Sequence, residues 1–71
     1  MKLNVFGRMD IEVIRRGDAW LCFYLGSEGK KRLAPDIHIP SSISGEQLIG
    51  YLEDLLHEWA TPQNHKIERL P

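Results

Sequence analysis

The residue types that most often carry chemistry are few in this chain and widely spaced. Its three histidines, His38, His57 and His65, do not follow the spacing of metal ligands, and Cys22 is its single cysteine. His57 and the glutamate after it match the start of a zinc-protease signature, but position 61, where that motif needs a second histidine, is a threonine. A chain of 71 residues also has little room for a substrate cavity of roughly 300 Å³ or more. We therefore expect no metal site, no cofactor and no enzymatic activity.

The basic residues are a second set that could bind a ligand, in this case phosphate. Lysine and arginine contact nucleic-acid backbones, and four residues are candidate phosphate contacts: Arg8, Lys30, Lys31 and Arg32. The pair Arg15-Arg16 should lie at the opposite end of a strand, about 20–23 Å away at about 3.3 Å per residue. The net charge of −1, and a segment over residues 34–60 with five Asp and Glu and no Lys or Arg, disfavour nucleic acid as a partner.

Residues 19–25 read Ala-Trp-Leu-Cys-Phe-Tyr-Leu, an apolar run with no polar side for water. The rest of the chain indicates one helix, and one helix can cover one face of a sheet. Aromatic side chains on the other face, among them Trp20 and Tyr24, therefore need further cover. Tryptophan and tyrosine are common at protein interfaces because they bury large areas and keep a polar group. The run thus favours binding of another protein.

Alternation of apolar and polar residues predicts strand structure near the start of the chain. Over residues 3–13 the odd positions are apolar except for Gly7, and most even positions are polar. A period of two over this length is typical of a strand with one buried face. Gly7 marks either a bulge in one long strand or a tight turn between two short strands. The sequence leaves both possibilities open.

The connection to the next strand decides which side chains share a face. We expect a three-residue loop, Arg15-Arg16-Gly17, with Gly17 in the left-handed conformation. The facing pairs are then Val13 with Ala19, Ile11 with Leu21 and Met9 with Phe23. A two-residue Gly17-Asp18 loop would instead place acidic residues beside apolar ones, namely Asp10 by Leu25 and Glu12 by Phe23. We favour the first register because it puts the odd-numbered apolar residues on one face, and a slip of one residue would reverse every side chain.

Three shorter segments follow with weaker signals. After a turn over residues 26–29, residues 30–33 are a predicted edge strand whose lysines discourage edge-to-edge pairing. Residues 36–39 lie between two prolines, so they form an edge strand or an extended connection. Residues 61–71 are either a flexible tail or carry a short last strand.

A single amphipathic helix is predicted after residue 44. Ser44 and Gln47 have the spacing of a capping box, in which each side chain binds the backbone amide of the other residue. Six apolar residues then fall on one stripe at helical spacing: Leu48, Ile49, Leu52, Leu55, Leu56 and Trp59. The dipeptide Thr61-Pro62 ends the helix.

Together these elements predict a single α+β domain over residues 1–71. It is an antiparallel meander of three to four strands with one amphipathic helix packed on one face. With the helix on the odd-numbered face, the outer face is expected to carry four partner-binding residues: Phe6, Ile14, Trp20 and Tyr24. Alternatively, the C-terminal tail covers this face or the sheet closes on itself.

The lone cysteine and the lack of a long apolar segment favour a cytoplasmic protein without a membrane span.

Several short strings are distributed along most of the chain: Val5-Phe6-Gly7-Arg8, Trp20, Leu25-Gly26, Gly29-Lys30-Lys31-Arg32, Ile39-Pro40, Tyr51-Leu52-Glu53-Asp54-Leu55 and His57-Glu58-Trp59-Ala60. In these strings the chain resembles a family of short uncharacterised bacterial proteins. The resemblance implies a bacterial source and no known activity. The order of the elements is also similar to that of HicB-type antitoxin domains, although the proline-rich turn after their second strand is absent here.

The preferred function is a non-enzymatic protein-interaction module that binds another protein, or a second copy of itself, through the outer aromatic face. The alternative is an antitoxin-like or nucleic-acid-associated regulator. Salt separates the two, because phosphate contacts through basic side chains weaken steeply with salt, whereas apolar contacts do not. We do not expect a membrane as a partner.

Overall fold

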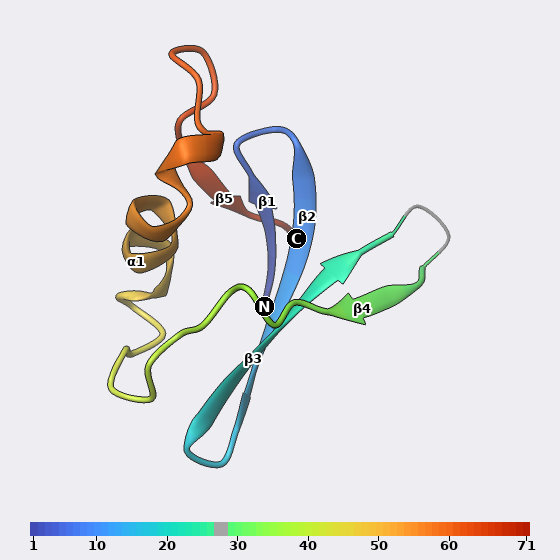
Figure 1. The fold of residues 1–71 in the computed structure, drawn as a ribbon, viewed down its shortest axis with the longest axis vertical. Helices are drawn as coiled ribbons and strands as arrows, with labels where there is room; N and C mark the ends of the chain where they lie inside the picture. Colours follow the sequence, from blue (N-terminus) through green and yellow to red (C-terminus); the bar gives the residue numbers. More distant parts are fainter. Residues whose placement is uncertain (27–28) are drawn as a thin grey trace.

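The chain forms one antiparallel sheet with a short helix beside it, in the α+β class that the sequence predicts (Figure 1). The computed structural model describes residues 1–26 and 29–71, so Ser27 and Glu28 of the predicted turn lie outside the described residues. The sheet has five strands in the order β4-β3-β2-β1-β5. The elements are β1 Lys2–Val5, β2 Met9–Arg16, β3 Ala19–Leu25, β4 Lys31–Leu33, the helix α1 Leu48–Leu55, the 3₁₀ helix η1 His57–Trp59 and β5 Ile67–Arg69.

The last strand explains why there are five strands rather than three to four. The end of the chain is not a flexible tail, because β5 pairs with the free edge of β1 and Ile67 lies opposite Val5. The Leu70 amide extends this pairing by donating to the Lys2 carbonyl at 2.9 Å. Residues 36–39 form part of the connection and not an edge strand, and a turn precedes them in which the Ile37 amide donates to the Ala34 carbonyl at 3.1 Å.

The turn between β1 and β2 settles the two possibilities for Gly7 in favour of a tight turn. Phe6 and Gly7 have positive φ angles of 54° and 70°, and the Arg8 amide donates to the Val5 carbonyl at 2.9 Å. A positive φ is unusual for phenylalanine, because its Cβ crowds the backbone at a cost of roughly 1–2 kcal/mol. The ring of Phe6 is 1 % exposed, and its burial contributes roughly 1.5–3 kcal/mol in compensation. The prediction that Phe6 lies on the outer face is therefore wrong.

The turn between β2 and β3 is shorter than predicted. Arg16 pairs with Ala19, so the loop consists of Gly17 and Asp18 alone. Gly17 has a φ of 60°, and a positive φ at the first loop position only is typical of a type II′ turn. The twist of such a turn matches the twist of the two strands, which explains why the two-residue loop is adopted.

This shorter loop changes which side chains of β3 face the core. Directly opposed residues in an antiparallel pair lie on the same face. Val13 is opposite Cys22 and Ile11 is opposite Tyr24, so the even-numbered residues of β3 share the face of the odd-numbered residues of β2. The predicted register is wrong, and every side chain of β3 lies on the face opposite to the predicted one.

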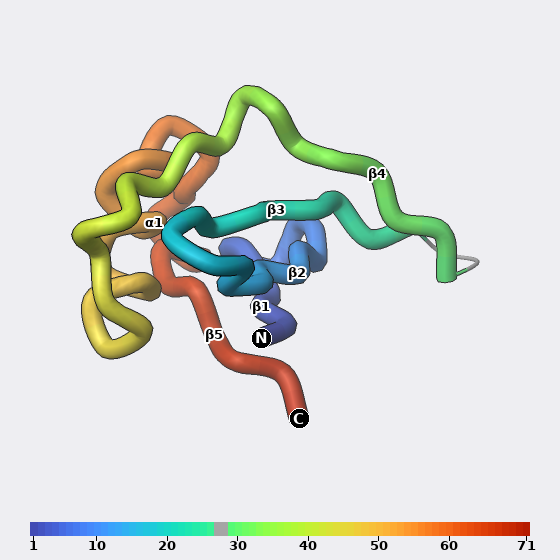
Figure 2. The backbone as a smooth tube through the Cα atoms, turned by 90° about the horizontal axis from the view of Figure 1, so that it is seen from below, coloured from blue at the N-terminus to red at the C-terminus, as the bar shows by residue number. Residues whose placement is uncertain are grey.

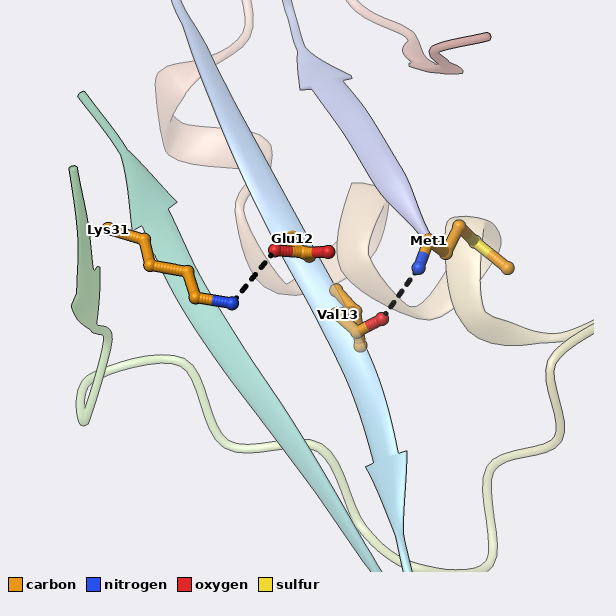
Figure 3. A network of polar contacts seen from close by, with 4 residues as sticks. All are labelled: Met1, Glu12, Val13 and Lys31. Atoms are coloured by element: carbon orange, nitrogen blue, oxygen red, sulfur yellow. Dashed lines mark hydrogen bonds and ion pairs between the residues drawn. The ribbon is translucent and has the colours of Figure 1, made fainter. Parts of the chain in front are cut away.

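The first residue adds one more pair to the β1–β2 ladder (Figure 3). The Met1 amino group donates to the Val13 carbonyl at 2.9 Å, and the Met1 carbonyl accepts from the Val13 amide at 2.8 Å. With β2 on one side and β5 on the other, β1 is an interior strand, and β4 and β5 are the edges of the sheet.

The helix begins later and is shorter than predicted, because residues 45–47 form a turn and α1 starts at Leu48 with Gln47 before it. The capping box is confirmed, because Gln47 Oε1 accepts from the Ser44 amide at 3.0 Å and Ser44 Oγ accepts from the Gln47 amide at 3.3 Å. The regular helix ends at Leu55, and η1 continues the chain toward Thr61. Three members of the predicted stripe are buried, Leu48, Leu52 and Leu56, whereas Leu55 is 42 % exposed.

Two segments cover one face of the sheet, which we call the inner face. One is α1 with η1, and the other is the connection over residues 34–47, which leaves β4, passes across β3 and reaches α1 (Figure 2). Buried side chains of both segments form one cluster with buried strand residues, and these are Leu3, Val5, Phe6, Ile11, Val13, Cys22, Ala34, Ile37, Ile39, Leu48, Leu52, Leu56 and Ile67. Within residues 1–26 and 29–71, no helix covers the opposite, outer face.

Candidate functional site

Trp20 lies on the inner face, where the chain itself covers it. Its Nε1 donates to the Ile43 carbonyl at 2.8 Å, and the Arg15 guanidinium lies 5.0 Å from the ring centroid. Arg15 in turn donates to the carbonyls of Gly17 and Ser41 at 3.2 and 3.1 Å. The connection over residues 34–47 thus provides the cover that we expected from the C-terminal tail or a partner. The prediction that Trp20 lies on the outer face is wrong.

Tyr24 is also on the inner face, next to the buried Cys22. The Tyr24 hydroxyl donates to Asp36 Oδ2 at 2.7 Å. Burial, this hydrogen bond and the charge of Asp36 raise the pKa of Tyr24 to about 12. Burial and the same carboxylate raise the pKa of Cys22 to about 11. Both groups are protonated near neutral pH, so neither is a ready nucleophile or base. The predicted position of Tyr24 on the outer face is wrong too.

The outer face carries a different set of apolar side chains, which we call the outer patch. Ile14 is opposite Leu21, Phe23 is opposite Leu33, and Leu25 follows Phe23 on the same face of β3. Leu33 is 57 % exposed, and the other four are partly exposed. None of the five packs against the core cluster. Ile14 is therefore the one predicted partner-binding residue that the structure places on the outer face.

A charged pair crosses the outer patch from β4 to β2. Lys31 Nζ lies 3.3 Å from Glu12 Oε1 (Figure 3). It also lies 4.9 Å from the centroid of the Phe23 ring. The side chains of Lys31 and Glu12 are 47 % and 21 % exposed, and an ion pair of this kind contributes little to stability. Lys31 therefore covers part of the Phe23 ring without fixing the two side chains strongly.

The polar side chains around the outer patch balance in charge. Cross-strand pairing places six charged residues on this face, three cations and three anions: Lys2, Arg16 and Lys31, and Asp10, Glu12 and Glu68. The outer face therefore combines an apolar strip with neighbours of both signs. Such a surface suits a protein partner better than a polyanion.

The four candidate phosphate contacts do not converge on one surface. Lys31 is on the outer face and bound to Glu12, whereas Arg32 is opposite Tyr24 on the inner face. Arg8 follows the first turn and lines a shallow hollow of about 390 Å³ that also includes Gly26. The Gly26 amide donates to the Lys30 carbonyl at 2.6 Å, so Arg8 and Lys30 lie at the same end of the sheet.

A second open hollow, of about 420 Å³, lies beside Trp20. It is lined by Arg15, Trp20 and residues 41–45. Ser44 Oγ already accepts from the Gln47 amide, and Arg15 already donates to two carbonyls. The bonds from Arg15 to Ser41 and from Trp20 to Ile43 hold the connection onto β2 and β3.

The outer-patch residues that the sequence analysis missed are Leu21, Phe23, Leu25 and Leu33. The signal that could have found them is the dipeptide Gly17-Asp18, because glycine followed by aspartate is a recognised two-residue hairpin loop. That loop fixes the register observed here.

Two further properties of the described residues bear on function. Over residues 1–26 and 29–71, no three His, Cys, Asp or Glu side chains are grouped closely enough to hold a metal ion. None of the helices in the same residues has the length and apolar character needed to cross a bilayer.

Comparisons with known proteins give a family and no function. Neither the curated proteins nor the solved structures contain a match to this chain. One family matches the sequence over residues 1–71, and its description is a domain of unknown function, DUF7661. Since the match extends from the first residue to the last, the chain belongs to the DUF7661 family.

Proposed function

We propose that this protein is a non-enzymatic, self-associating interaction module whose outer patch binds the outer patch of a second copy. The observation that supports the proposal is the strip of five apolar side chains on the sheet face opposite α1, outside the core cluster. Sheets normally bury such a face against a second layer of structure. Burial of the strip in a dimer would stabilise it by about 25 cal/mol for each Å² of apolar surface removed from water.

The balanced charge of the outer face favours a second copy over other partners. A dimer with a twofold axis places the same surface against itself, so a surface of one sign would repel its own copy. Three cations and three anions avoid this repulsion and allow opposite charges to meet. The same balance offers no net attraction to nucleic acid or to an anionic membrane.

The size of the face predicts a weak, reversible dimer. The five strands have 25 residues, and at about 3.3 Å along and about 4.8 Å across each strand they give a face of roughly 400 Å². Two such faces bury on the order of 800 Å², which is below the roughly 1,200 Å² at which stable interfaces begin. We therefore expect a dissociation constant in the micromolar range or weaker.

The antitoxin-like or nucleic-acid-associated alternative lacks comparable support. Lys31 is paired with Glu12, and the other candidate phosphate contacts are spread over different surfaces. The similarity to HicB-type antitoxins rests on the order of the elements and stays a prediction, as does the bacterial source.

Sedimentation equilibrium of two matched leucine variants tests self-association. Leu33 and Leu55 are both exposed leucines, but Leu33 is in the outer patch and Leu55 is on α1. The wild-type protein should approach twice its chain mass of 8.2 kDa as concentration rises. Leu33→Gln should weaken the dimer by roughly tenfold or more, because each of two copies loses an apolar contact worth about 1 kcal/mol. Leu55→Gln should leave the dissociation constant unchanged.

Two outcomes would refute the proposal. One is a wild-type protein that stays monomeric up to millimolar concentration. The other is a dimer that responds equally to Leu33→Gln and Leu55→Gln, because the contact would then not involve the outer patch.

A further inference from the structure

Within residues 1–26 and 29–71, no strand pairs with the outward backbone groups at the β4 edge of the sheet, so this edge can accept another strand. The Gly26 amide donates to the Lys30 carbonyl at 2.6 Å, and the Ala34 amide donates to the Cys22 carbonyl at 2.8 Å. Hydrogen-bonded and non-bonded pairs alternate along an antiparallel ladder. Arg32 is thus the residue of β4 that bonds to β3, and the backbone N–H and C=O groups of Lys31 and Leu33 face away from the sheet.

The side chains at this edge are strongly basic. Lys30, Lys31 and Arg32 are consecutive and exposed, and Leu33 follows them with the highest exposure among the large apolar residues described. Arg32 lies on the inner side of the edge, and Lys31 and Leu33 lie on the outer side. A strand added here would meet positive charge on its inner side, and Leu33 beside the Lys31–Glu12 pair on its outer side.

The positive charge of the β4 edge indicates which kind of strand can pair with it. Two β4 edges cannot pair readily, because six cations would come together, and edge lysines are a known device against such pairing. The β5 segment of a second copy is a poor match as well, because Glu68 is flanked by Lys66 and Arg69. An extended segment with acidic side chains would satisfy the backbone groups and the cations of Lys30 and Arg32 together, while Lys31 stays paired with Glu12.

We infer that the β4 edge binds an extended acidic peptide segment as a sixth strand of the sheet. The segment runs antiparallel or parallel to β4 and uses its backbone to bond to Lys31 and Leu33. Its acidic side chains face Lys30 and Arg32 on the inner side, and an apolar side chain on the outer side contacts Leu33. This partner differs from the second copy proposed for the outer patch, although the two surfaces share Leu33, so the β4 edge goes beyond the proposed function.

A designed peptide of alternating glutamate and valine tests the inference by fluorescence anisotropy. The wild-type protein should bind it, and binding should weaken as salt rises from about 0.05 to about 0.5 M, since the ion pairs are exposed and screened. A lysine–valine peptide should not bind. An acidic peptide N-methylated at alternate residues should bind at least about tenfold more weakly, because it retains its charge and loses backbone donors.

Protein variants locate the binding at the edge. Leu33→Pro removes an outward N–H that β3 does not use, whereas Leu33→Ala keeps it and serves as the matched control. Leu33→Pro should weaken peptide binding by roughly tenfold relative to Leu33→Ala, since it removes a backbone hydrogen bond at the new pairing. Lys30→Gln with Arg32→Gln should weaken binding by roughly three- to thirtyfold. Lys66→Gln with Arg69→Gln, at the opposite edge, should have no effect.

Amide exchange measures the occupied edge directly. The Lys31 and Leu33 amides should become protected when the acidic peptide binds. The inference is overturned if the acidic peptide fails to bind at millimolar concentration, if its N-methylated form binds equally well, or if the Leu33→Pro and Leu33→Ala proteins bind it alike. Since these readouts report on the edge and sedimentation reports on the outer patch, either proposal can fail without the other.

Discussion

At the scale of single residues, Trp20 and Phe23 have different roles although both are aromatic residues of β3. Trp20 donates a hydrogen bond to the connection and packs against the core cluster, whereas Phe23 lies on the outer face beneath Lys31. Trp20→Ser should therefore destabilise the fold by about 3 kcal/mol or more, and Phe23→Ser should cost much less. Urea unfolding of the two variants measures the difference. Equal losses of stability would contradict the assignment of the two faces.

The buried thiol and the bonded phenol make stability depend on alkaline pH. The pKa of Cys22 rises from about 9 to about 11 on folding, so the unfolded chain loses this proton first. The contribution of Cys22 is present below pH 9 and is lost as the pH rises toward 11. The contribution of Tyr24 to stability is likewise lost as the pH rises from 10 to about 12. Urea midpoints should fall less steeply with pH in Cys22→Ala and in Tyr24→Phe than in the wild-type protein. If the urea midpoints of the variants and of the wild-type protein fall equally with pH, deprotonation of Cys22 and Tyr24 is not coupled to unfolding.

At the scale of the elements, two glycines should respond in opposite directions to the same substitution. Gly17 has a positive φ in the β2–β3 turn, where a Cβ is strained, so Gly17→Ala should cost about 1–2 kcal/mol. Gly50 lies inside α1 with open space around its position, so Gly50→Ala should stabilise by about 0.5–1 kcal/mol. Thermal melts should show a lower midpoint for the first variant and a higher midpoint for the second. A rise in the midpoint of Gly17→Ala would contradict the type II′ turn.

The elements also show where sequence reasoning works and where it does not. The capping box is a local signal, because Ser44 and Gln47 are three residues apart and bond to each other. The register of β2 and β3 depends on one turn, and the run over residues 19–25 is apolar on both faces, so its pattern could not correct a wrong loop length. The pairing of β5 with β1 joins the two ends of the chain, and no local pattern encodes it.

At the scale of the whole molecule, the fold class could be predicted and the identity of the outer patch could not. The expectation that apolar strand surface exceeds what one helix covers holds, because the outer patch lies outside the core cluster. The apolar residues on the outer face differ from the predicted ones. The connection over residues 34–47 covers Trp20 and Tyr24 on the inner face, whereas Phe23 and Leu33 lie on the outer face. Ile14 is the predicted residue that belongs to the actual patch.

Isotope-filtered nuclear Overhauser measurements on a mixture of labelled and unlabelled protein test the central claim most directly. Self-association through the outer patch predicts contacts between copies that join the Phe23 ring and the methyl groups of Ile14, Leu21 and Leu33. It predicts none between copies at Trp20 or at the inner face of α1. Contacts between copies that involve the helix, or no such contacts at the highest soluble concentration, would contradict self-association through the outer patch.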